Sequence, residues 1–279
     1  MNVIKTRIWN DRTHPLHSHI KRIGVLGKQA VRKKYLSEKQ AGSVDEAWLR
    51  SILDDIDSNK VFCHVGLSDV NSAFEGNPYE FLRDLLHEYF DTVMAPAFTS
   101  SFIESKVYSQ KYTKSDSGTF SNLLIDDAEY RTPDALRSIV VDGPFRFNDC
   151  EHRDSYGSNS AFAKLEKENV PVLNIGTPWL KCSQWHFLEQ QYDVPYMKKP
   201  TFEGVQINEG GEAINISQKT GLFEGVWAHN RPKITRVLMK NEILRSHQRN
   251  SLNVMWHRLG DMRRCLGSKL RLNPYYLVT

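Results

Sequence analysis

Apolar residues recur along the chain in two patterns, one typical of helices and one typical of buried strands. A helical pattern follows Ser43-Val44-Asp45-Glu46, which has the Ser-x-x-Glu form of a capping box, and it predicts a first helix there. Similar spacing predicts a second helix over residues 78–90. Short apolar runs over 60–64 and 92–98 predict strands. Strands that alternate with helices in this way are typical of a sheet covered by helices.

The second half of the chain continues the pattern and adds a glycine-rich segment. Residues 170–176 (V-P-V-L-N-I-G) predict a buried strand with a proline at its start, and residues 183–191 predict a short helix. Alternating, glycine-containing sequence over 200–225 predicts a small β-hairpin, and residues 235–272 are expected to be helical and basic. The expected fold is therefore α/β, a three-layer α/β/α arrangement with a central mixed sheet and a small β insert.

The pattern divides the chain into a basic N-terminal extension, residues 1–43, and a domain over residues 44–279. Lysines and arginines alternate with apolar residues over 20–35, as in a helix that lies on an anionic membrane surface. We favour a solvated helix packed on the domain, which is the commoner structure for such a stretch. The start of the chain has no apolar signal-peptide core, and no apolar run approaches the ~18 residues of a membrane helix. We therefore expect a cytoplasmic protein.

Composition narrows the function classes only a little. The chain has 279 residues, 40% of them hydrophobic, and a net charge of +4, so it can bury a large core and carries a mildly basic surface. No nucleic-acid-binding module is recognisable, and no nucleic-acid partner is expected. The cysteines are far apart in the sequence, which does not favour a zinc site or a disulfide framework, and we expect no metal. The oligomeric state, including a homodimer, is left open.

The segment most informative about chemistry runs from Gly176 to Glu189, where a predicted strand ends, a loop follows and a helix begins. His186 and Glu189 are three residues apart and lie on one face of that helix. A carboxylate beside an imidazole fixes its tautomer and stabilises the imidazolium that forms when a general base takes a proton. Ser183 at the helix start can present a hydroxyl to a developing oxyanion. These three residues are the candidate catalytic group.

The same segment allows two other interpretations, a metal site and a cysteine nucleophile. A His-x-x-Glu pair is half of a di-iron ligand set, but the second Glu-x-x-His pair that such a site needs is absent from the sequence. Cys182 precedes His186 by four residues, and a Cys–His pair can form a covalent thioester intermediate. We favour a small buried cysteine with no role in the reaction. Loss of activity in a Cys182→Ser variant of normal stability would instead favour the thioester.

The surroundings of this segment carry further short motifs. Short segments occur in a fixed order from about Lys60 to Lys199: His64-Val65-Gly66-Leu67-Ser68, Met94-Ala95-Pro96-Ala97-Phe98-Thr99, a turn around Gly118, Arg137-Ser138, Gly157-Ser158-Asn159-Ser160-Ala161-Phe162, Ser183-Gln184-Trp185-His186-Phe187-Leu188-Glu189 and Val194-Pro195-Tyr196. In order and spacing they resemble the aminoglycoside 3-N-acetyltransferase family. The resemblance covers half of the chain.

The resemblance implies acetyl-CoA as the donor, an amine on an aminoglycoside or amino sugar as the acceptor, and direct transfer in a ternary complex. It implies His186 as the general base and a set of residues near the coenzyme: Leu67, Ser68, Thr99, Arg137 and Ser138. From the residues alone, Arg137 fits either a coenzyme phosphate or an ion pair with Asp134 or Asp142. His64 fits either a ligand contact or a structural histidine.

The chain also departs from the family pattern. The family usually continues Arg-Ser with x-His-Pro, whereas this chain has Ile139-Val140-Val141, which removes a polar side chain expected to line the site. Gly66 stands where the family has a serine, and its backbone N–H is free to approach a pyrophosphate. Two alternatives therefore stay open: an acyltransferase of the same fold that modifies a hydroxyl or uses a longer acyl chain, and a non-catalytic relative that binds a sugar or a partner.

Overall fold

The computed structural model of the protein describes residues 44–279. A seven-stranded sheet forms its centre, and the strands in spatial order are β11 (Arg245–Arg249), β12 (Leu252–Arg258), β6 (Pro171–Ile175), β1 (Lys60–Val65), β2 (Thr92–Pro96), β5 (Ile139–Asp142) and β4 (Tyr130–Arg131). Strand β1 is parallel to both β2 and β6, and the outer pairings are antiparallel. The predicted mixed sheet is confirmed.

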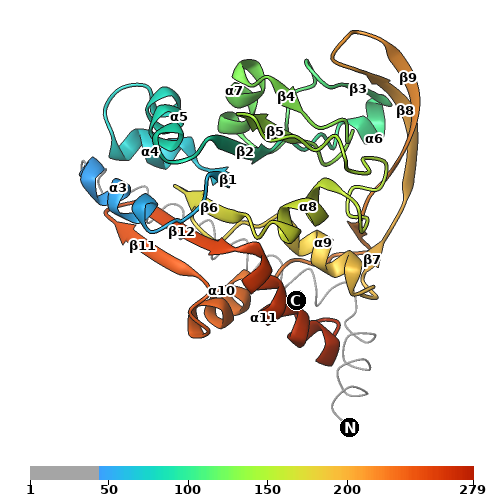
Figure 1. Cartoon of the computed structure of the whole chain (residues 1–279). Coiled ribbons are helices and arrows are strands. Elements are labelled where there is room, and N and C mark those ends of the chain that lie inside the picture. Colours follow the sequence, from blue (N-terminus) through green and yellow to red (C-terminus); the bar gives the residue numbers. More distant parts are fainter. Residues whose placement is uncertain (1–43) are drawn as a thin grey trace.

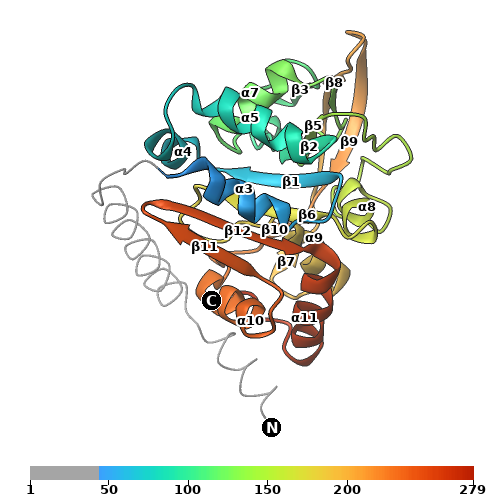
Figure 2. The same ribbon diagram turned by 60° about the vertical axis from the view of Figure 1, so that its left-hand side comes forward.

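Helices cover both faces of this sheet (Figures 1 and 2). One face packs against α3 (Glu46–Asp54), α4 (Leu67–Ala73), α5 (Pro78–Tyr89) and α7 (Thr119–Asp127). The other face packs against α8 (Ala161–Lys167), α9 (Gln184–Gln191), α10 (Arg231–Lys240) and α11 (Leu259–Leu272). Side chains of a strand alternate between the faces, so Val61 and Cys63 join the first core and Phe62 joins the second. The three-layer α/β/α fold is confirmed.

The expected β insert is also present. Strands β8 (Thr201–Ile207) and β9 (Ala213–Lys219) form an antiparallel hairpin, which runs along one side of the domain in Figure 1. Strand β3 (Val107–Ser109), which follows the short helix α6 (Phe102–Ser105), pairs in parallel with β8. Strand β7 (Met197–Lys198) precedes this hairpin in the chain and β10 (Leu222–Phe223) follows it, and these two short strands pair with each other.

Two details of the expected secondary structure are wrong. The first helix begins at Glu46 and is capped by Asp45, whose carboxylate accepts a hydrogen bond of 2.9 Å from the backbone N–H of Ala47. Ser43, where the capping box was expected to begin, lies outside the described residues. The basic region 235–272 is not continuously helical, because β11 and β12 interrupt it around a turn at Asn250. Alternate residues of β12 face opposite cores, which stabilises a strand there.

Two glycines allow the ends of β1 and β6 to meet. A Cβ atom on Gly66 would lie 2.2 Å from the carbonyl oxygen of Gly176, and a Cβ on Gly176 would lie 2.4 Å from the oxygen of Gly66. Gly176 also has a φ of +66°, which side-chain-bearing residues rarely adopt. The N–H of Gly66 donates to the carbonyl of Ile175 at 2.8 Å, so it is used in this junction and is not free for a pyrophosphate.

Across residues 44–279, none of the helices combines the length and the apolar character needed to cross a membrane. The segment 20–35, for which membrane-surface contact was the alternative interpretation, lies outside the described residues.

Candidate active site

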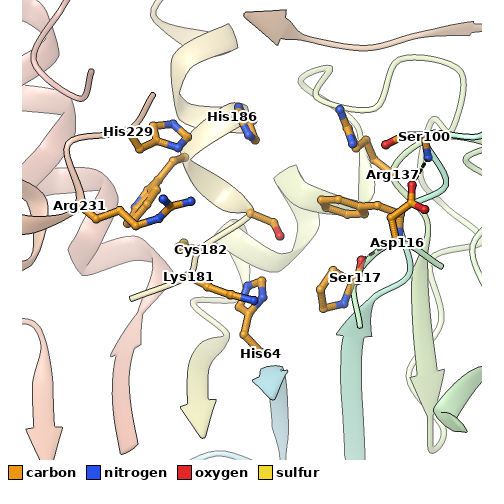
Figure 3. Close-up of a pocket in the computed structure, with 14 residues that line it drawn as sticks. His64, Ser100, Asp116, Ser117, Arg137, Lys181, Cys182, His186, His229 and Arg231 are labelled. Atoms are coloured by element: carbon orange, nitrogen blue, oxygen red, sulfur yellow. Dashed lines mark hydrogen bonds between the residues drawn. The ribbon is translucent and has the colours of Figure 1, made fainter. Parts of the chain in front are cut away.

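A cavity of about 270 Å³ lies where the parallel strands β1, β2 and β6 end (Figure 3). This is the edge of an α/β sheet at which ligands usually bind. His64 reaches it from β1, Pro96 and Phe98 come from the end of β2, and α9 supplies His186. The loop before α9 contributes Lys181, Cys182 and Ser183, so the segment chosen from the sequence does line the cavity.

His186 and Glu189 form the expected pair on α9. Nδ1 of His186 lies 3.1 Å from Oε2 of Glu189, and the His186 side chain is 27% exposed whereas that of Glu189 is fully buried. With Nδ1–H donating to the carboxylate, Nε2 of the ring is left as the acceptor of a proton. The carboxylate therefore sits behind the imidazole, on the side away from solvent, as an orienting group should.

Two further residues hold Glu189, and sequence reasoning did not assign either to the site. Nε2 of His229 lies 3.0 Å from Oε1 of Glu189, and the hydroxyl of Tyr196 donates to the same oxygen at 2.9 Å. The rings of His186 and His229 have centroids 4.9 Å apart, so one buried carboxylate joins two adjacent imidazoles. His229 itself lines the cavity.

These contacts set the protonation of the cluster. Burial lowers the pKa of His186 below its ordinary value, and the charge and hydrogen bond of Glu189 oppose this effect. Burial alone would raise the pKa of Glu189, but His229 and His186 together hold it at about 2. Burial and the neighbouring Glu189 raise the pKa of Tyr196, so its hydroxyl keeps the proton that it donates. A neutral His186 beside an ionised Glu189 is the state that a general base requires.

Comparison with known proteins identifies the family. The family model for aminoglycoside 3-N-acetyltransferases matches residues 62–270, which is well over half of the chain. The chain belongs to this family. A search of the curated proteins gave no significant match.

Solved structures of the same fold lie at low sequence identity. AAC-IIIb in a binary complex with CoASH is 16% identical with a TM-score of 0.67, and the match covers 83% of this chain and 97% of that one. YokD from Bacillus subtilis is 16% identical with a TM-score of 0.66, over 86% and 98%. AAC-VIa bound to sisomicin is 15% identical with a TM-score of 0.66, over 83% and 98%. At these identities the likeness shows the fold.

The residues that the family pattern assigns to the coenzyme do not all meet in the cavity. Arg137 lines it, and its guanidinium lies 5.1 Å from the centre of the Phe98 ring. The hydroxyls of Thr99 and Ser138 are fully buried and donate to the carbonyls of Ala135 and Ala97, so neither side chain reaches the cavity. Leu67 and Ser68 begin α4 and are absent from the cavity wall. Their role at the coenzyme stays a prediction.

The nearby carboxylates bear on whether Arg137 forms an ion pair or stays open to a ligand. Asp142 is occupied by Arg83 and His87, at 2.7 and 2.9 Å, and Asp134 accepts the backbone N–H of Arg137. Within residues 44–279, Nε of Arg137 is buried without a hydrogen-bond partner. The alternative of an ion pair with Asp142 is therefore wrong. The charge of Arg137 acts on the pKa of Asp134, but no ion pair joins them among the described residues, so a ligand contact stays open.

The departure from the family at 139–141 is structural. Ile139, Val140 and Val141 form β5, and their side chains are 0 to 1% exposed in the two cores. Alternation along this interior strand buries all three side chains, so none of them lines the cavity in this chain.

Ser183 and Cys182 lie side by side at the start of α9. Ser183 occupies the N-cap position, but its hydroxyl makes no capping hydrogen bond and the residue lines the cavity. The Cys182 thiol is 4.0 Å from the sulfur of Met262, and burial raises its pKa to about 12. A thiol that keeps its proton is a poor nucleophile, which favours the structural interpretation of this cysteine.

His229 could have been found only in part from the sequence. Asn230 accepts a hydrogen bond from the N–H of Lys233 at the start of α10. An asparagine at the N-cap with a proline in the first helical turn, here Pro232, is a sequence signal for a helix start. That signal predicts the helix but not its position beside α9. The three side chains of His186, Glu189 and His229 also have the spacing of a metal site, with ligand atoms within 4.8 Å. Hydrogen bonds account for their contacts, and absence of a metal stays a prediction.

Proposed function

We propose that this protein is an acetyl-CoA-dependent N-acetyltransferase that modifies an amino group of an aminoglycoside or amino-sugar acceptor. Membership in the family supports N-acetyl transfer as the activity. The observation that carries the proposal is the cavity-lining His186 with its Nδ1 held by the buried Glu189 at 3.1 Å.

In the proposed reaction, Nε2 of His186 accepts a proton from the acceptor amine as the nitrogen attacks. Glu189 keeps Nδ1 protonated and stabilises the imidazolium that forms. A base positioned in this way contributes about 10²–10⁴ in rate. The imidazolium then returns the proton to the departing thiolate, so a C–N bond replaces a C–S bond and the proton balance is closed.

Acetyl-CoA would supply the activated carbonyl carbon. Two features of the cavity fit it. Nε of Arg137, which has no hydrogen-bond partner within residues 44–279, suits a phosphate or carbonyl oxygen, and the Ser183 hydroxyl, which does not cap α9, suits an oxyanion. The solved relative with bound CoASH, AAC-IIIb, supports this choice of donor. We infer a cytoplasmic reaction, because acetyl-CoA is available there.

Direct transfer is the proposed route. A two-step route would need a nucleophile beside His186, and the Cys182 thiol has a pKa raised to about 12 by burial. Sisomicin is bound by the relative AAC-VIa, which supports an amine-bearing sugar as the acceptor class.

The first test is thermal unfolding of the full chain with and without acetyl-CoA. A ligand at ~100 times its Kd adds about 2.7 kcal/mol. For a chain of this size that raises Tm by about 5–10 °C. Release of free thiol with amino-sugar acceptors then measures turnover. We expect His186→Asn to lower kcat by at least ~10² while the acetyl-CoA shift persists.

His247→Asn is the matched control, because His247 lies on edge strand β11 and does not line the cavity. It should keep both turnover and the shift. Absence of any shift with millimolar acetyl-CoA would refute the proposed donor, and full turnover by a folded His186→Asn variant would refute the base.

A further inference from the structure

The charges around the cavity are unbalanced. Two arginines and a lysine line it, Arg137, Arg231 and Lys181, whereas Asp116 is the one carboxylate on its wall within residues 44–279. Oδ2 of Asp116 already accepts the backbone N–H of Ser100 at 2.6 Å. Lys181 has an interaction of its own, so the two arginines are the cations that make this wall favour an anionic group and disfavour a ligand whose amines are all charged.

Arg231 is the cation best suited to hold such a group. Its Nε is buried without a hydrogen-bond partner in the described part of the chain, and its guanidinium lies 5.7 Å from the centre of the Trp179 ring. Burial alone lowers its pKa, with no carboxylate acting on it among the described residues. A partly buried guanidinium without a counter-ion is costly, and a bound anion would offset that cost.

The surroundings of Arg231 also favour a bound anion. It is the first residue of α10, a ten-residue helix capped by Asn230, and the positive end of a helix dipole favours anions. His64, which also lines the cavity, is 8% exposed, and its Nε2 has no partner among residues 44–279, so a second buried polar atom there lacks a hydrogen bond. Figure 3 shows Arg231 and Arg137 on opposite sides of His186, with the guanidinium of Arg231 directed toward the middle.

The position of Arg231 separates it from the phosphates of coenzyme A. Arg231 follows His229 by two residues, so their Cα atoms are at most about 7 Å apart. His229 in turn packs beside His186, with ring centroids 4.9 Å apart. The phosphates of acetyl-CoA lie a full pantetheine arm away from the thioester carbon that must approach His186. An anion held at Arg231 therefore belongs to the acceptor.

We propose that the acceptor is an amino sugar carrying a phosphate or carboxylate, and that Arg231 binds this anionic group. The inference rests on the proposed N-acetyl transfer and names the substrate class of the same site. It separates this chain from a relative such as AAC-VIa, which binds sisomicin, because a polycationic sugar would be repelled by Arg231.

The test is calorimetric titration of the full chain saturated with coenzyme A, so that the donor site is filled. The probes are glucosamine, glucosamine 6-phosphate, the corresponding 2-amino-2-deoxyglucuronate and sisomicin. At least one anionic probe should bind about tenfold or more tightly than glucosamine, which is the effect of about one charge-assisted bidentate contact. The phosphate and carboxylate probes distinguish the two sources of the charge. Sisomicin should bind no better than glucosamine.

Arg231→Gln should reduce the preference for the anionic probe to within about threefold, and Arg231→Lys should keep part of it because the charge remains without the planar fork. Arg236→Gln removes the same charge from an exposed position of α10 and should keep the preference in full. Anionic probes that bind no better than glucosamine, tighter binding of sisomicin, or a preference that survives in Arg231→Gln would overturn the inference. Those results with intact acetyl-CoA binding leave N-acetyl transfer standing, whereas failure to bind the coenzyme overturns both.

Discussion

Nε2 of His229 donates to Oε1 of Glu189 across 3.0 Å, although the two residues are 40 positions apart in the chain. The contact leaves Oε2 of the carboxylate to His186, so each oxygen serves one imidazole. A buried carboxylate with both oxygens engaged cannot rotate, and the ring that it orients is held with it. The general base of the proposed reaction therefore depends on a residue that follows the β insert and is remote from the His-x-x-Glu motif.

His229 should act as a positioning residue. His229→Leu removes one hydrogen bond from Glu189 and one group whose charge lowers the pKa of His186, so that pKa should rise. We expect kcat to fall about tenfold, the acid limb of kcat/KM to move to higher pH and stability to fall by about 1–3 kcal/mol. His229→Gln keeps an N–H donor and should recover most of kcat. A purely structural role would leave the acid limb where it is.

Glu189→Gln should move the same limb in the other direction. The carboxylate raises the pKa of His186, and its loss leaves burial unopposed, so the pKa falls further below its ordinary value of about 6.5. Because the neutral ring is the active form, the acid limb should shift to lower pH. At the plateau, kcat should fall by at least ~10², since the imidazolium loses its counter-charge. The measurement is kcat/KM from pH 4.5 to 9 for both variants, and shifts of the same sign would contradict the arrangement.

The local part of the site could be predicted from the sequence, and the long-range part could not. The three-residue spacing of His186 and Glu189 places them on one helical face wherever the helix packs, so their pairing follows from the sequence. The bond from Glu189 to His229 depends instead on how α10 and the last residues of the chain pack, which helical spacing does not encode.

The fold shows the same division. The apolar runs of β1 and β6 identify central strands because their residues are buried on both faces. In β12 the run Leu252-Asn253-Val254-Met255-Trp256-His257-Arg258 mixes polar and apolar residues within a basic region, so it resembles a helix until its pairing with β6 is known. Pairing with distant strands overrides local propensity there.

The thiol of Cys182 provides a test of direct transfer. Cys182→Ser should keep kcat within about threefold, because a thiol whose pKa is raised to about 12 contributes no thiolate at neutral pH. It should lower stability by about 1–3 kcal/mol, since the residue is 7% exposed among apolar side chains and a hydroxyl costs more to bury there than a thiol. Steady-state kinetics and Tm give the two readouts. A variant of normal Tm with a 10²-fold loss of kcat would replace direct transfer with a thioester route.

Two buried histidines outside the Glu189 cluster should make the protein sensitive to mild acid. Burial lowers the pKa of His257 to about 4, and burial with the charges of Lys181 and His257 lowers the pKa of His64 to about 3. As the pH falls below about 6.5 the unfolded chain binds these protons and the folded chain does not, so the free energy of unfolding must fall.

Each such histidine contributes a slope of about 1.4 kcal/mol per pH unit between pH 6.5 and 4.5. His257→Leu removes one titrating group and, within the described residues, two buried ring nitrogens without partners. The variant should therefore be at least as stable as the natural protein at pH 5, with the slope lower by about 1.4 kcal/mol per unit. Urea unfolding at pH 4.5, 5.5, 6.5 and 7.5 measures both slopes. Equal slopes would mean that His257 is already protonated in the folded protein and that a counter-charge stabilises it there.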